Sequence, residues 1–246
     1  KTPGHPYSND LDLLGEKSVF HHINRTETII GEKKLAQWLQ HLLPKDQIEP
    51  QQEAIKELSE KLEWRQNVEA YAYLANETEE QLQLLQSWKD SELKPISSLT
   101  VYLSYITPFI FAGGLIAYFV TDQTLYSNIA FYTFLVNVFM LFSNFKKFKA
   151  EMAYTSKADD ILKNYSVILS AIESASFESS KLKDLQQKLY HKNSSASSRI
   201  KHLSGLFTQL DNIQNPIGAL IINGIYPYHF GVYNRLTQAK KVIAHS

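Results

Sequence analysis

The segment IIGEKKLAQWLQHLL, Ile29–Leu43, places an apolar residue at every third or fourth position. This spacing puts the apolar side chains on one face of an α-helix and the charged and amide side chains on the other. Thr28 precedes the segment, and its hydroxyl is placed to accept a hydrogen bond from an amide of the first turn. Pro44 follows it and ends the pattern. We therefore predict an amphipathic helix between Thr28 and Pro44.

Similar helical stripes continue toward the C-terminus. Asp46 and Glu49 have the spacing of a capping box and precede an apolar stripe at Ala54, Ile55, Leu58 and Leu62. Further helices are predicted at Thr78–Trp88, from about Ser156 through Ile172, at Leu182–Leu189 and at Ala196–Leu210, with breaks at Asn215-Pro216 and Tyr226-Pro227. No segment shows the sustained alternation of strands joined by hairpin turns. The predicted fold class is all-α, a multi-helix domain.

Two apolar runs interrupt these amphipathic helices. Leu99–Val120 and Gln123–Phe145 contain no charged residue, and only Thr121-Asp122 separates them. Each run is long enough to cross the roughly 30 Å of hydrocarbon in a bilayer. Lys94 lies before the first run, and three lysines follow the second, Lys146, Lys147 and Lys149. Positive charge at both ends predicts that both ends face the cytoplasm and that the turn lies outside.

The apolar runs and the lysines also have other interpretations. Five polar side chains within the runs suit a buried helical hairpin at the centre of a soluble domain: Ser104, Thr107, Ser127, Asn128 and Asn137. Pro108 would kink the first helix, and Gly113-Gly114 would allow a close approach between helices in either case. Lys146, Lys147 and Lys149 are the candidate contacts to DNA phosphates, or else charges that flank a membrane.

Composition limits the chemistry of the chain. It has 25 basic and 25 acidic residues, so no overall field favours nucleic acid. It has no cysteine, which excludes disulfides and thiolate metal sites. Gly15-Glu16-Lys17-Ser18 lacks the glycine that a phosphate-binding loop needs before its lysine, and His21-His22 lacks metal-ligand spacing. We predict no catalytic residue, metal or cofactor in these residues. The chain begins at Lys1, and we expect it to be part of a longer protein.

One residue pattern resembles a known family. The order Thr26-x-Thr28-x-x-Gly31-x-x-x-Leu35-x-x-Trp38-Leu39, followed by Gln52-x-Ala54-Ile55-x-x-Leu58, resembles the core domain, domain III, of the MutS DNA mismatch-repair proteins. The resemblance covers roughly residues 10–65. Lys33 and Gln51 stand where the family usually has arginines. The apolar runs suit a branch of small, membrane-associated MutS-like proteins. The motif is expected to be structural, with Leu35, Trp38 and Leu39 buried against neighbouring helices.

The resemblance implies a division into three parts. Residues 1–95 would be the first part of the core, 96–149 the apolar hairpin, and 150–246 the second part, leading toward a separate ATPase domain. The core would couple DNA binding or anchoring to that ATPase, with ATP, Mg²⁺ and a homodimer in the parent protein. The alternative is a membrane-anchored helical scaffold without mismatch recognition. The expected location is the cytoplasmic face of the inner membrane, or the cytoplasm if the hairpin is buried.

Overall fold

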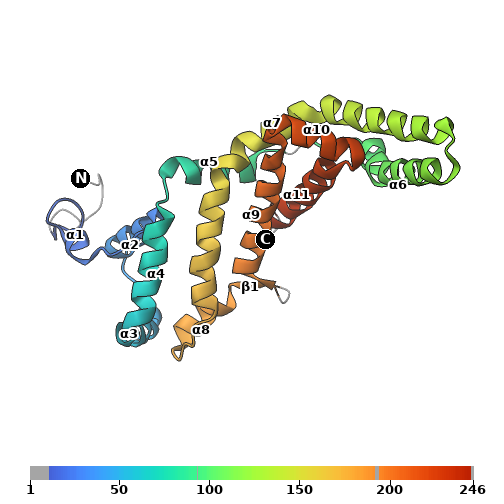
Figure 1. Ribbon diagram of the computed structural model, residues 1–246. Helices are drawn as coiled ribbons and strands as arrows, with labels where there is room; N and C mark the ends of the chain where they lie inside the picture. Colours follow the sequence, from blue (N-terminus) through green and yellow to red (C-terminus); the bar gives the residue numbers. More distant parts are fainter. Residues whose placement is uncertain (1–10, 93, 192–193, 245–246) are drawn as a thin grey trace. The chain divides into compact units, whose positions relative to one another are not determined.

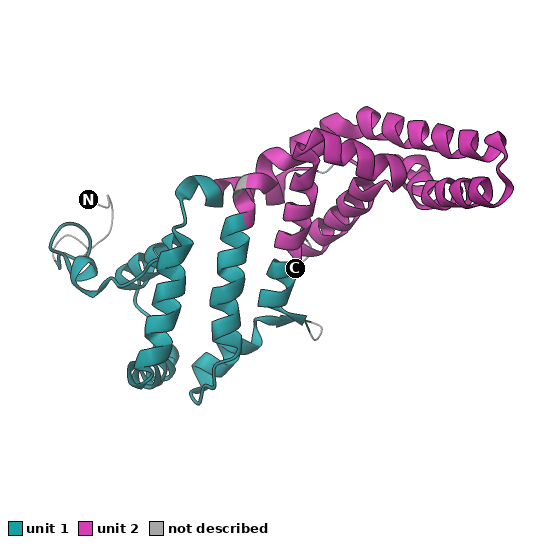
Figure 2. Cartoon of the chain, in the orientation of Figure 1, with its two compact units in different colours: residues 1–82, 160–201 teal, residues 83–159, 202–246 magenta. Residues whose placement is uncertain are grey.

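The computed structural model describes residues 11–92, 94–191 and 194–244 (Figure 1). It is 81% helix, which confirms the all-α prediction. Its two short strands, β1 (Tyr190–His191) and β2 (Ser194–Ser195), pair antiparallel. Two compact units divide the chain: residues 1–82 with 160–201 form unit 1, and residues 83–159 with 202–246 form unit 2 (Figure 2).

Unit 1 consists of short helices and part of a long one. Its complete helices are α1 (Val19–Ile23), α2 (Ile29–Gln40), α3 (Lys45–Glu60), α4 (Leu62–Ala75) and α8 (Ser180–Gln187). It also contains the beginnings of α5 (Glu79–Asp90) and α9 (Ala196–Asp211), and the second part of α7 (Thr124–Glu173). The predicted helix from Ser156 is therefore the continuation of a helix that starts at Thr124.

The start of α2 agrees with the prediction from sequence. The Thr28 hydroxyl accepts a hydrogen bond from the Gly31 amide at 3.1 Å. A Cβ atom at position 31 would lie 2.8 Å from Thr28 Oγ1, so glycine leaves room for this cap. At the other end, α2 stops at Gln40 with the His41 amide bonded to the Gln37 carbonyl. The helix therefore ends before Pro44.

Two local predictions in this region are wrong. The first is the burial of the apolar stripes: Trp38 is 50% exposed, Leu35 and Leu39 are only half-buried, and Ile55 is exposed. Helix α3 buries only Ala54 of its stripe, and no residue of α2 is fully buried. Asp46 does not cap α3, because Pro44 starts the helix at Lys45 and leaves Asp46 inside the first turn. A reciprocal capping box instead opens α5, where Thr78 and Gln81 exchange hydrogen bonds at 3.0 and 3.3 Å.

Polar contacts attach the first helices of unit 1 to α7. Glu77 accepts hydrogen bonds from the Ile29 amide and, at 2.7 Å, from the Tyr165 hydroxyl. Trp64 Nε1 donates to the Ala171 carbonyl at 3.0 Å, and its ring meets Phe177 edge-on at 5.5 Å between centroids. These contacts join α2, α4 and α7 across large separations in the sequence.

Glu57 is expected to make the stability of unit 1 pH-dependent. Its carboxylate accepts hydrogen bonds from the amides of Ser179, at 2.7 Å, and Glu178, at 2.8 Å, just before α8. The Ser179 amide is the larger cause that holds the pKa of Glu57 below its usual value. The stabilisation is complete above the ordinary glutamate pKa of about 4.3 and is lost as pH falls through the lowered pKa.

We therefore expect Glu57→Gln to lower the thermal unfolding midpoint at pH 7 and to reduce the difference between pH 7 and pH 3. The exposed Glu60 on the same helix supplies the matched control, Glu60→Gln. Thermal unfolding of the unchanged chain and of the two variants, followed by circular dichroism at pH 7 and pH 3, tests this. Equal pH dependence in all three would show that Glu57 does not hold the start of α8.

Unit 2 contains the apolar segments. It comprises the larger part of α5, α6 (Ser98–Thr121), the first part of α7, most of α9, the 3₁₀ turn η1 (Asn212–Gln214), α10 (Pro216–Ile225) and α11 (Tyr228–Ala244). Asn215 caps α10 by accepting from the Gly218 amide at 3.1 Å, and Pro216 occupies the first helical position. Tyr226 and Pro227 separate α10 from α11. Both predicted breaks are confirmed.

The core of unit 2 is aromatic. Trp88 is 4.9 Å from Phe207 and Phe148 is 5.3 Å from Phe230, between ring centroids, and all four side chains are buried. Trp88 Nε1 donates to the buried Glu151 carboxylate. Lys240 Nζ lies 4.8 Å from the Trp88 ring centroid and donates to Ser91 Oγ at 2.7 Å. This cluster joins α5, α7, α9 and α11.

Candidate membrane-spanning hairpin

Helix α6 and the first part of α7 form an antiparallel hairpin, drawn in green in Figure 1. Asp122 makes the turn in the left-handed conformation, with φ of 54°, and its amide donates to the Tyr118 carbonyl at 2.8 Å. Gly114 allows the two helices to meet, because a Cβ there would lie 3.0 Å from the Tyr126 carbonyl oxygen and 3.2 Å from the Ala130 nitrogen. Of the two glycines predicted to admit a close approach, Gly114 does so and Gly113 faces open space.

These two glycines form a matched pair for testing the hairpin. Gly114→Leu should push α6 away from α7, with a cost of about 1–3 kcal/mol for overpacking. Gly113→Leu should leave the packing intact, because a Cβ there meets nothing within 4 Å. Limited proteolysis and thermal melting in detergent would compare the two variants. Equal stability of both would contradict the observed contact.

The outer surface of the hairpin is apolar. Among the described residues, two helical segments are long and apolar enough to cross a membrane: α6 (Ser98–Thr121) and the part of α7 from Thr124 to Ser156. In the most apolar 18-residue stretch of each segment, only 17% and 22% of the residues, respectively, are buried. Phe109, Phe119 and Phe139 are among the many large exposed side chains. A soluble monomer rarely exposes an apolar area of this extent, and the buried-hairpin alternative requires cover that the described residues do not supply.

Several polar side chains of the hairpin lie on its inner side. Ser104, Thr133 and Asn137 are buried. Ser104 Oγ donates to the Val101 carbonyl and Thr133 Oγ1 to the Ile129 carbonyl, each at 2.7 Å. Of the five polar residues that suit a soluble core, Ser104, Thr107 and Asn137 are buried, Ser127 is half-buried and Asn128 is exposed. Thr107 Oγ1 has no hydrogen-bond partner among the described residues. Most of the large apolar side chains of the hairpin are exposed. This is the reverse of a water-soluble helical pair and suits hydrocarbon as the surrounding solvent.

The two ends of the hairpin lie together in unit 2. Lys147 Nζ donates to the Pro95 carbonyl at 2.9 Å, which links the exit of the apolar part of α7 to the entry of α6. The Tyr233 hydroxyl donates to the Lys94 carbonyl, also at 2.9 Å. Of the three candidate DNA-binding lysines, Lys147 is half-buried in this contact, whereas Lys146 and Lys149 are exposed. Because the start of α6 and the end of the apolar part of α7 are adjacent, both lie on the same side of any membrane that the hairpin crosses.

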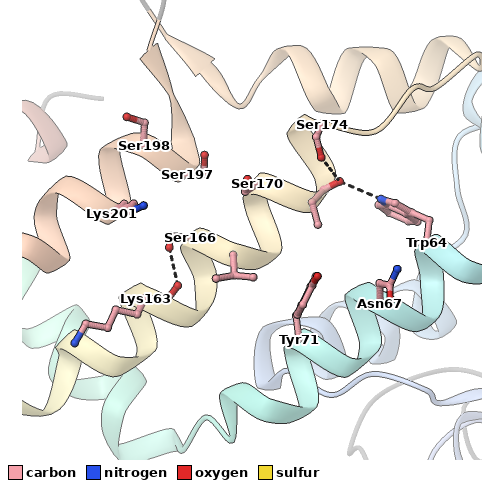
Figure 3. Close-up of a pocket in the computed structure, with 12 residues that line it drawn as sticks. Trp64, Asn67, Tyr71, Lys163, Ser166, Ser170, Ser174, Ser197, Ser198 and Lys201 are labelled. Atoms are coloured by element: carbon pink, nitrogen blue, oxygen red, sulfur yellow. Dashed lines mark hydrogen bonds between the residues drawn. The ribbon is translucent and has the colours of Figure 1, made fainter.

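Unit 1 contains an open groove of about 880 Å³ between α4, α7 and α9 (Figure 3). Its lining is rich in hydroxyl groups and includes Trp64, Tyr71, Ser170 and Lys201. The start of α9 beside it would suit an anion. The Glu173 carboxylate occupies that position, accepting hydrogen bonds from the amide and hydroxyl of Ser197. The groove therefore lacks an open anion site at this helix, and within the described ranges no cluster of His, Cys, Asp or Glu is placed to hold a metal.

The residues of the MutS-like motif lie on α2 and α3 and in the segment before α2, within unit 1. Thr28 and Gly31 serve the helix cap, and Ala54 is the buried member of the α3 stripe. The candidate DNA-binding lysines lie in unit 2. Sequence reasoning missed the buried, hydrogen-bonded pair Asn223 and His229, and it missed the contact of Asn137 with the Gly224 carbonyl, because nothing in the local spacing marks these residues as neighbours.

Comparison of the chain with protein-family models, with curated proteins and with solved structures found no match. The MutS-like motif consequently remains a prediction.

Proposed function

We propose that this chain is a membrane-anchored helical scaffold, in which the α6–α7 hairpin crosses a bilayer twice and the remaining helices form an interaction module on one side. The observation that carries this proposal is the distribution of side chains on the hairpin: large apolar side chains are exposed, and Ser104 and Thr133 are buried with their hydroxyls hydrogen-bonded to the helix backbone. The 24 residues of α6 extend about 36 Å, enough for the hydrocarbon layer.

The proposed orientation follows from charge. Lys94 lies just before α6, and Lys146 and Lys149 lie just after the apolar part of α7, so all three are at the end of the hairpin opposite its turn. The turn itself contains Asp122. Lysines concentrate on the cytoplasmic side of membrane proteins. The ends and both amphipathic portions of the chain would therefore be cytoplasmic, at the inner membrane of a bacterial cell, and the Asp122 turn would be outside.

Single-cysteine labelling tests this topology cleanly, because the native chain has no cysteine. Gln123→Cys places the thiol in the turn and Lys149→Cys places it at the ends. We expect a membrane-impermeant maleimide to label position 123 in intact spheroplasts and position 149 only after permeabilisation. Labelling of both positions in intact spheroplasts, or of neither until permeabilisation, would contradict a double crossing with this orientation.

A second candidate is a DNA-coupled role, supported by the motif from Thr26 to Leu58. In that role the chain would be the core of a MutS-like mismatch-repair protein, relaying between DNA and an ATPase domain that uses ATP and Mg²⁺ in a homodimeric parent. The capped α2 is compatible with a structural role for the motif residues.

Salt-dependent DNA binding distinguishes the two candidates. The chain is placed in nanodiscs of neutral lipid, and its binding to duplex DNA is measured at several salt concentrations. If the DNA-coupled role is right, we expect the variant Lys146→Gln/Lys149→Gln to bind more weakly. We also expect the salt dependence of its binding to fall by about two phosphate contacts. The scaffold role expects no difference between this variant and Lys181→Gln/Lys183→Gln, which neutralises two lysines of α8. A reduced slope confined to the first variant would favour the DNA-coupled role.

A further inference from the structure

We propose that α10 is a third membrane-embedded element, a re-entrant half-helix that enters the lipid beside α7, ends near the middle of the bilayer and returns through Tyr226-Pro227 into α11. This inference rests on the proposed crossing of the membrane by α6 and α7. It assigns lipid acyl chains as the partner of the exposed face of α10.

Two contacts fix the course of the chain around α10. Shortly before α10, Thr155 Oγ1 of α7 donates to Asp211 at 3.2 Å. At the far end of α10, Asn137 Nδ2 donates to the Gly224 carbonyl at 2.9 Å. The chain therefore runs back along α7, from the charged region at residue 155 into the apolar region at residue 137. Figure 1 shows α10 beside α7.

The length of α10 agrees with a half-crossing. Its 10 residues extend about 15 Å, half of a hydrocarbon layer of about 30 Å. The contact residues Phe134 and Asn137 lie on α7 about 12–17 Å beyond Phe145, the last residue of the apolar run, at 1.5 Å per residue. Both measures place the end of α10 close to the bilayer centre.

The surface of α10 is continuous with that of the hairpin. Ile217 is 73% exposed, and Ile221, Ile222, Ile225 and Tyr226 are also exposed. No Asp, Glu, Lys or Arg occurs from Asn212 to Asn234. Gly224 sits so close to α7 that a Cβ atom would lie 2.1 Å from the Phe134 ring. The isoleucines of α10 therefore extend the apolar surface of α7 instead of forming a separate patch.

Several backbone groups at the end of α10 and in the turn after it have internal partners, which backbone in hydrocarbon needs. The Tyr226 amide donates to the Ile222 carbonyl at 2.8 Å, and Asn137 satisfies the Gly224 carbonyl. Asn223 Oδ1 accepts from the His229 amide at 3.0 Å, while its Nδ2 donates to the Ala219 carbonyl at 2.7 Å. Asn137 and Asn223 thus pair backbone groups where the chain folds back, while Ile225 and Tyr226 stay exposed.

Spin labels at exposed positions measure the depth of α10 directly. Single cysteines at Ile217, Ile221 and Ile225 report on α10, Phe109→Cys reports on the hairpin, and Leu74→Cys on α4 is the aqueous reference. All five side chains are exposed, so labelling preserves the fold, and circular dichroism verifies this. The protein is reconstituted in phosphatidylcholine vesicles, and the collision rates of each label with oxygen and with a water-soluble nickel chelate are compared.

We expect the ratio of oxygen to nickel collisions to rise at least tenfold from Leu74 to Phe109. Within α10 it should increase from Ile217 through Ile221 to Ile225, which should approach Phe109. A high ratio at Phe109 with all three α10 positions equal to Leu74 would overturn the re-entrant helix and leave the hairpin in place. Equal ratios along α10 would also overturn it. A ratio at Phe109 equal to that at Leu74 would overturn the proposed membrane crossing itself.

Discussion

The double variant Phe109→Asp/Val136→Asp will lose its association with membranes. Both side chains are exposed, Phe109 by 79%, and lie near the centres of the two apolar runs. Aspartate at the centre of a membrane-spanning helix disfavours insertion by about 2.5–3.5 kcal/mol, so two of them disfavour it by about 5–7 kcal/mol. We expect the variant to leave the vesicle fraction in a flotation gradient and to appear as soluble or aggregated protein.

The matched control is Leu74→Asp, which places the same charge on an exposed apolar residue of α4 in unit 1. It should float with the vesicles as the unchanged chain does. Because Phe109 and Val136 are exposed, their replacement removes little packing, and a soluble protein would tolerate it. Flotation of the double variant at the level of the unchanged chain would therefore argue against insertion of the hairpin.

The variant Trp88→Ala will unfold unit 2 or bring it close to unfolding. Truncation of a buried tryptophan costs about 3–5 kcal/mol through lost transfer energy and the cavity left behind. It also removes the donor to the buried Glu151 carboxylate, which adds about 1–3 kcal/mol. The edge-on contact with Phe207 and the cation–π contact with Lys240 disappear as well. The sum approaches the whole stability of an ordinary domain, about 5–15 kcal/mol.

Urea unfolding in detergent, followed by circular dichroism, measures this loss. Trp88→Phe retains the ring but not the Nε1 donor and should lie between the native chain and Trp88→Ala. Trp38→Ala truncates a half-exposed tryptophan in unit 1 and should cost far less. If the Trp88 and Trp38 alanine variants proved equally stable, the cluster of Trp88, Glu151 and Lys240 would not be the core of unit 2.

Local chemistry explains which helices could be predicted from sequence. The cap at Thr28 and the breaks at Asn215-Pro216 and Tyr226-Pro227 depend on neighbouring residues, and the structure contains them. Helix α4 was missed because its buried face consists partly of alanines, Ala72 and Ala75, which contrast weakly with its outer face. Helix α7 was divided in two because the lysines at 146–149 end the apolar run. They change the surroundings of the helix and not its backbone, so the predicted division at residue 149 falls within one helix.

The candidate site was only partly predictable for a different reason. Length and charge suffice to mark Leu99–Phe145 as a hairpin, but the inward position of Ser104 and Asn137 depends on which faces of α6 and α7 meet. Helix α10 gave no membrane signal because a run of 10 residues is too short to cross a bilayer. Its position became visible only through the contacts of Gly224 with Phe134 and Asn137, which are far apart in sequence.

The most direct test of the membrane-anchored scaffold is the partition of the unchanged chain between soluble protein and membranes washed with alkaline carbonate after expression in bacteria. Carbonate strips peripheral proteins but leaves membrane-spanning ones in the pellet. The exposed apolar hairpin predicts that the chain stays in the washed membranes and is released only by detergent. Recovery of the chain as a soluble, helical monomer would contradict the account, because the apolar surface of α6 and α7 would then face water.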